Sequence, residues 1–157
     1  MHGRIYQILT KPLPESEWLT AEDFYDYNDP TIDYIQSSSC LRTEDLQFLC
    51  DILPESLFKM EGDTIEVTTD GHTFMEEVFH RLQDDISELQ LYINEPKKIS
   101  MLLYKISRYC DHLFGRSVMF FLDGAFYASS STDFIMDSLI YHSGQKLYVG
   151  AILDFHY

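Results

Sequence analysis

Asp154 and His156 are the residues of this chain best placed to do acid–base chemistry. They stand two apart in an alternating stretch, so on a β-strand both side chains point to the same face. A carboxylate next to a histidine can set the tautomer of the imidazole and raise its basicity. Nucleophilic catalysis would also need a Ser, Thr or Cys, and Tyr6 or Tyr148 could complete a binding pocket. The alternative is a strand end with two polar residues in solvent.

Other signatures of catalysis or metal binding are missing from the sequence. There is no P-loop, no glycine-rich dinucleotide motif, no H-E-x-x-H and no G-x-S-x-G. There is no C-x-x-C either, which argues against a structural zinc site. His80 and Asp84 lie one helical turn apart, but no third ligand follows at a useful spacing. We therefore expect no metal and no cofactor, and a binding protein rather than an enzyme.

A second candidate site is the stretch from residue 18 to residue 34, which mixes aromatic and acidic side chains. In one interpretation it is an amphipathic helix and loop, capped by Thr20 over residues 21–27, with its rings packed inward. In another it is an interaction surface, with aromatic anchors and acids that complement a basic partner. A sharper version is a nucleic-acid mimic, whose carboxylates replace phosphates. The candidate residues are Trp18, Glu22, Asp23, Tyr25, Asp26, Tyr27 and Asp29.

The composition narrows the classes of partner. The 157 residues hold 26 acids and 11 bases, a net charge of −15. Such a charge repels nucleic acids and anionic membranes and attracts basic proteins. No run of about 18 apolar residues and no signal peptide are present. The three cysteines are odd in number, and Cys50 and Cys110 fall on apolar helical stripes, which predicts buried free thiols and a cytoplasmic location.

The charge is unevenly distributed along the chain. Residues 61–95 hold ten acids and one base, whereas residues 96–116 hold five bases and one acid. The bases and a histidine of the second segment share one helical face, and two interpretations stay open. Either the face neutralises an acidic neighbouring helix, or it binds an anion. The face consists of Lys97, Lys105, Arg108 and His112.

The last stretch, residues 146–157, has the pattern of a central strand. Its odd positions are apolar throughout, and its even positions are apolar only at the start. Gly150 interrupts the even face and predicts a bulge or the close approach of another segment. Residues 4–10 form a further strand, which we expect could pair with the last one.

Helical periodicity is clearest in residues 74–93, after a capping box formed by Thr73 and Glu76. A second periodic stretch ends at Gly115, and the short link between the two predicts an antiparallel αα-hairpin. A helix beginning near Thr43, hairpins around Gly62 and Asp123-Gly124, and a short helix over residues 133–141 complete the expected elements.

Together these patterns predict one domain, residues 1–157, of the α+β class. We expect a mainly antiparallel sheet of about four to five strands, with the αα-hairpin and short helices packed on one face. The first functional hypothesis is a protein-interaction module of the inhibitor, immunity or antagonist type, of bacterial or phage kind, that binds a basic protein. The second is a small enzyme or ligand binder with a pocket near Asp154 and His156. The third is an architectural homodimer without chemistry.

Overall fold

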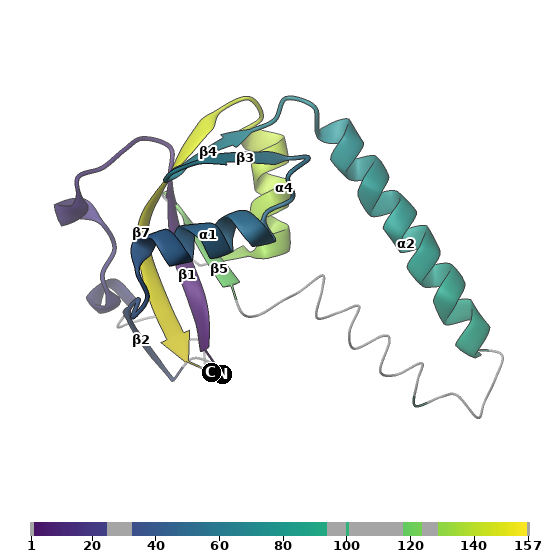
Figure 1. Cartoon of the computed structure of the whole chain (residues 1–157), viewed down its shortest axis with the longest axis horizontal. Coiled ribbons are helices and arrows are strands. Elements are labelled where there is room, and N and C mark those ends of the chain that lie inside the picture. Colours follow the sequence, from purple (N-terminus) through teal and green to yellow (C-terminus); the bar gives the residue numbers. More distant parts are fainter. Residues whose placement is uncertain (1, 25–32, 94–99, 101–117, 124–128, 157) are drawn as a thin grey trace.

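The structure is a computed structural model that describes residues 2–24, 33–93, 100, 118–123 and 129–156 (Figure 1). The helices are η1 (Glu15–Glu17), η2 (Ala21–Phe24), α1 (Arg42–Ile52), α2 (Gly71–Ile93) and α4 (Ser131–Tyr141). The strands are β1 (His2–Leu9), β2 (Tyr34–Ser37), β3 (Phe58–Glu61), β4 (Thr64–Val67), β5 (Val118–Leu122), β6 (Ser129–Ser130) and β7 (Lys146–His156).

Strand β7 is the centre of the sheet, as its sequence pattern predicts. Strand β1 pairs with it antiparallel along one edge, from His2 opposite His156 to Leu9 opposite Tyr148. Two short strands share the other edge: β4 pairs with its beginning and β2 with its end. The first and last strands of the chain are thus neighbours, and β7 has a partner on both sides at each end (Figure 1).

The sheet differs from the mainly antiparallel one of four to five strands that we expected. It has seven strands in the order β3-β4-β7-β1-β5-β6, with β2 attached to β7, and it is mixed because β1 and β5 run parallel. The sequence did not predict β2, since the strand is only four residues long and has one apolar aliphatic residue, Ile35. The parallel pair could not be predicted because register and direction depend on contacts between residues more than a hundred positions apart.

The helices do not all pack on one face, which is a second correction. Buried residues of α1, α4 and the start of α2 join the larger core on one face of the sheet, with Leu49, Phe134 and Phe74 as examples. On the opposite face a smaller core forms where Phe24 of η2 packs on residues of β1 and β7. The N-terminal segment therefore covers the side of the sheet that helices α1 and α4 leave open.

Gly150 marks a β-bulge, in agreement with the sequence. Tyr6 lies opposite Ile152 and Ile8 opposite Val149, so Gly150 and Ala151 together face the single residue Gln7. A Cβ atom on Gly150 would lie 2.5 Å from Oε1 of Gln7, which explains the glycine. The bulge also changes the alternation of β7. Its odd residues are all buried, but Leu147 and Val149 enter the larger core and Leu153 and Phe155 the smaller one on the other face.

Helix α2 leads away from the sheet (Figure 1). It begins two residues before Thr73, because Asp70 accepts a hydrogen bond from the amide of His72 at 3.1 Å and so caps the helix instead. Ile86, one of the apolar residues of the periodic stretch 74–93, is 53% exposed. The second helix of the expected αα-hairpin lies outside the described residues, as do Cys110 and the basic face of residues 97–112.

Two smaller predictions have opposite outcomes. The short C-terminal helix is confirmed as α4, and Ser130 caps it by accepting from the amide of Asp133 at 3.2 Å. Cys50, in contrast, is exposed rather than buried, because it lies on the outer side of α1. Among the described residues, no helix is long and apolar enough to cross a bilayer.

Candidate functional site

Asp154 and His156 occupy the polar end of β7, and each is held by a different partner. Ser39 donates to Oδ2 of Asp154 from its amide at 3.0 Å and from its hydroxyl at 3.2 Å. Nδ1 of His156 lies 3.0 Å from Oδ2 of Asp33, and the imidazole stacks on the ring of Tyr34. The carboxylate that orients His156 is therefore Asp33, which the sequence pattern did not indicate.

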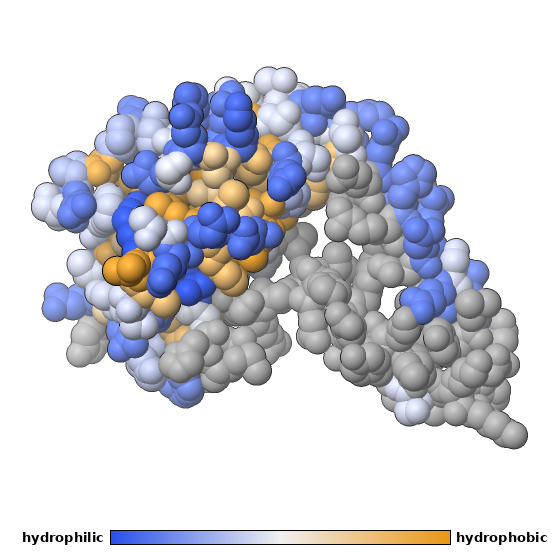
Figure 2. Space-filling model, viewed as in Figure 1, coloured by the Kyte–Doolittle hydropathy of each residue, from blue (hydrophilic) through white to orange (hydrophobic). Residues whose placement is uncertain are grey.

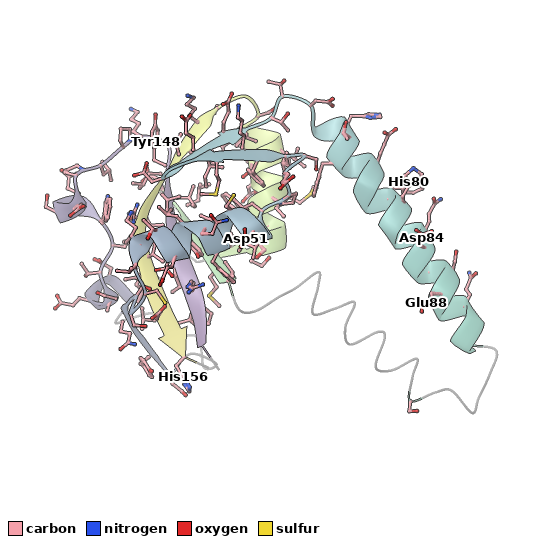
Figure 3. The ribbon with its side chains drawn as sticks, in the orientation of Figure 1. Asp51, His80, Asp84, Glu88, Tyr148 and His156 are labelled. Carbon is pink, nitrogen blue, oxygen red and sulfur yellow. The ribbon has the colours of Figure 1, made fainter. Side chains whose placement is uncertain are left out.

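The two tyrosines that we considered for this pocket lie elsewhere. Figure 3 shows Tyr148 and His156 at opposite ends of β7, eight positions apart, which corresponds to about 26 Å of extended strand. Tyr6 is fully buried, and its hydroxyl donates to the backbone carbonyl of Asp45 at 2.9 Å. Burial raises the pKa of the Tyr6 phenol far above its usual range, so the hydroxyl keeps its proton and remains a donor.

A buried ion pair lies next to Asp154, between β1 and α1. Nε of Arg4 is 2.7 Å from Oδ1 of Asp45, whose side chain is 1% exposed. The contact is short but poorly aligned with the N–H bond, so it is an ion pair rather than a good hydrogen bond. Ser38 donates to the second oxygen of Asp45 at 2.7 Å. The guanidinium also lies over the ring of Phe48, 4.4 Å from its centroid.

Arg4 completes this network through a contact with Cys40. Its Nη2 lies 3.5 Å from the Sγ atom of Cys40, which directly precedes Leu41, the N-cap residue of α1. Burial alone would lower the pKa of Arg4, but the hydrogen bond to Cys40 and the neighbouring Tyr6 and Asp45 outweigh it, and the pKa is raised. Arg4 is thus a permanent cation whose charge Asp45 balances. The sequence contained one indication of this network, because Arg4 is a charged residue within a mostly apolar strand, but we did not predict the network from it.

The bulge brings Asp154 to this network. Arg4, Tyr6 and Ile8 alternate regularly along β1, and their partners on β7 are Asp154, Ile152 and Val149. Tyr6, Ile8, Val149 and Ile152 all belong to the larger core, on the side of α1. Without the extra residue at the bulge, Asp154 and His156 would point to the opposite face.

An open pocket of about 390 Å³ lies at this end of the sheet. Asp154 contributes to its lining, whereas His156 does not. Oδ1 of Asp154 has no hydrogen-bond partner within the described ranges, since both hydrogen bonds from Ser39 go to Oδ2. The lining residues are Gly3, Arg4, Gln36, Ser39, Cys40, Phe48 and Asp154.

The acidic-aromatic stretch is only partly described, and its described part is fixed to the body. Phe24 packs edge-on against Phe121, with 5.5 Å between the ring centroids. The indole N–H of Trp18 donates to the carbonyl of Leu13 at 3.1 Å, and Arg42 lies 4.5 Å from the centroid of its ring. Trp18 therefore packs against the protein itself. Tyr25, Asp26, Tyr27 and Asp29 lie outside the described residues.

The acids of this segment point outward. Asp23 accepts from the amide of Thr20 at 2.7 Å and from its hydroxyl at 3.0 Å, which holds the turn before η2. The exposed carboxylates of residues 15–24, which we call the N-terminal acidic face, belong to Glu15, Glu17, Glu22 and Asp23. No Lys or Arg occurs within residues 15–24.

The rest of the described surface is acidic as well. Among the side chains that the structure describes, sixteen Asp and Glu are exposed, against the three exposed bases Lys11, Lys59 and Lys146. Hydrophilic residues follow α2 and the rim of the body in Figure 2. His80, Asp84 and Glu88 point outward from α2 (Figure 3), and no three His, Cys, Asp or Glu side chains of the described residues come together as a metal site.

Comparison of the chain with protein-family models, with curated proteins and with solved structures finds no match. The function must therefore be argued from the charge, the pocket and the contacts above.

Proposed function

We propose that this protein is an interaction module of the inhibitor, immunity or antagonist type that binds a basic protein through its N-terminal acidic face. The observation that carries the proposal is the division of residues 15–24 into two sides. The apolar side chains, with Phe24 the most buried, pack inward, and all four carboxylates point outward without a neighbouring cation in the segment. Such a face attracts a basic surface and repels nucleic-acid phosphates.

The rigidity of the segment also supports the proposal. Its backbone is tied to the sheet, because Oε1 of Gln7 accepts the amide of Leu19 at 3.1 Å. Trp18 is fixed by its hydrogen bond to the carbonyl of Leu13 and by its contact with Arg42, and this packing anchors the backbone that carries the acidic face. Carboxylates on a fixed backbone lose little conformational freedom on binding, which favours affinity over that of a mobile acidic tail.

Charge reversal on matched surfaces tests this function. One variant carries Glu15→Lys, Glu17→Lys and Glu22→Lys, and the control carries Asp51→Lys, Glu55→Lys and Glu61→Lys, all at exposed positions. Both change the net charge equally. In quantitative affinity capture from lysate of the native host, we expect a basic protein bound by the wild type to be lost at least tenfold from the first variant and retained by the control. Equal recovery from both variants, or equal loss, would contradict the proposed face.

A further inference from the structure

We propose that the pocket at the polar end of β7 receives one cationic side chain, lysine or arginine, of the protein partner. The inference rests on the proposed function, because it assigns a specific contact to the same basic partner. It also goes beyond it, because the pocket lies outside the N-terminal acidic face and is built from other elements.

The charge of the pocket determines the kind of ligand. Two charged residues line it, Arg4 and Asp154, and they face each other in the β1–β7 register. The guanidinium of Arg4 is turned toward Asp45 instead, which lies within 2.7 Å and balances its charge. Asp154 is left as the unbalanced charge of the lining, and among the described residues its Oδ1 accepts no hydrogen bond. A cation is therefore the complementary group.

The position of the carboxylate is set before a ligand arrives. Asp154 stands on a strand with partners on both edges, Arg4 of β1 and Gln36 of β2. Two hydrogen bonds from Ser39 fix Oδ2. The side chain of Asp154 therefore loses little rotamer entropy when a ligand binds to its other oxygen. A free carboxylate on a flexible surface side chain would gain much less from an ion pair.

The walls of the pocket suit the stem of a long basic side chain. Phe48 and Cys40 supply apolar surface to the lining, and Gln36, which lies opposite Asp154 in the β2–β7 register, adds a further polar residue. Lysine and arginine bury their methylene groups on apolar surface while the charged head reaches a polar partner. The volume of about 390 Å³ is at the small end of ligand sites, and the pocket is open, as entry of a side chain from a protein surface requires.

A titration with three short peptides tests the pocket directly. The probes are capped tripeptides with lysine, arginine or the neutral isostere norleucine between two glycines, added to the ¹⁵N-labelled full chain. We expect saturable shifts of the amide signals of Gly3, Gln36, Ser39 and Cys40 with the lysine or arginine peptide, and binding at least tenfold weaker with norleucine. Equal shifts with norleucine, or no saturable shift with either cation, would overturn the proposal.

Three variants separate charge from structure. Asp154→Asn keeps an oxygen for Ser39 but removes the charge, so we expect at least a tenfold loss of peptide binding with an otherwise unchanged spectrum. Asp84→Asn on α2 removes an equal charge at a distant exposed position and should bind like the wild type. Ser39→Ala keeps the charge and the hydrogen bond from the amide but loses the one from the hydroxyl, so binding should weaken less than in Asp154→Asn. Unchanged binding by Asp154→Asn would refute the pocket, while loss of the partner from the acidic-face variant would still support the proposed function.

Discussion

The two halves of strand β7 have the same secondary structure but different tasks. Leu147 and Val149 in the first half are at most 2% exposed and pack in the larger core. In the second half Asp154 and His156 are half-buried, and their hydrogen-bond partners are Ser39, two residues after β2, and Asp33, directly before it. The bulge at Gly150 lies between them. One extra residue is enough to place a polar strand end on the face where the core would otherwise continue.

The bulge persists because side chains satisfy the backbone groups that it removes from the ladder. Oε1 of Gln7 accepts the amide of Ala151 at 3.0 Å. Arg42 donates to the carbonyls of Gly150 and Val149 at 2.7 Å and 2.6 Å. Buried backbone groups left unpaired would each cost about 1–3 kcal/mol. The bulge that separates the two halves of β7 is thus stabilised by side-chain hydrogen bonds from β1 and α1.

The largest expected effect concerns the ion pair beside the polar half. Asp45→Ala leaves Arg4 partly buried without its counter-charge, which should lower the free energy of unfolding by about 3–5 kcal/mol. Urea denaturation measures it. The double variant Arg4→Met with Asp45→Leu should recover most of the loss, because an apolar pair needs no compensation. A decrease in the free energy of unfolding of less than about 1 kcal/mol for the single variant would mean that this ion pair does not stabilise the polar end of β7.

The next effect separates the two halves directly. Leu147→Ala removes a fully buried side chain from the larger core and should cost about 2–5 kcal/mol. Asp154→Asn in the second half keeps its shape and an acceptor oxygen for Ser39, so it should cost only about 1 kcal/mol. Denaturation of both variants under the same conditions gives the comparison. Similar losses would mean that both halves serve stability alike.

A smaller effect is expected at the bulge. Gly150→Ala places a methyl group against Gln7, whose amide must move and weaken its bonds to Leu19 and Ala151. We expect a loss of about 1–3 kcal/mol in the free energy of unfolding. Hydrogen exchange should also show faster exchange of the Leu19 amide. Unchanged exchange at Leu19 would mean that Gln7 does not link the N-terminal segment to β7.

The smallest effect is the loss of one hydrogen bond. Tyr6→Phe removes the donor to the carbonyl of Asp45 and should cost about 1 kcal/mol at neutral pH. Because burial raises the pKa of Tyr6 in the folded state, its contribution to stability is complete below the unfolded pKa of about 10 and falls as the pH rises above it. The difference between wild type and variant, measured by denaturation from pH 7 to 11, should therefore shrink at alkaline pH. A constant difference would contradict the burial argument.

Local patterns in the sequence determined much of the fold of this protein. The alternation of residues 146–157 predicts a central strand, and the periodicity of residues 74–93 predicts α2. Gly150 predicts a bulge or the close approach of another segment, and the structure has a bulge there. These signals succeed because they depend on neighbours within one element. The high acid content and the candidate residue Asp154 also follow from the sequence alone.

Only the tertiary structure decided which side chains meet. The alternation of β7 predicts that Asp154 and His156 form a pair. In the structure, Asp154 instead accepts a hydrogen bond from Ser39, and His156 contacts Asp33. Arg4 and Asp45 are 41 positions apart. In the sequence, Arg4 is an isolated charge in a strand and Asp45 a residue in the first turn of a helix. They form an ion pair only because α1 packs over β1. Strand β2, three of whose four residues are exposed, exists because the free edge of β7 supplies its hydrogen bonds, which no pattern within four residues can show.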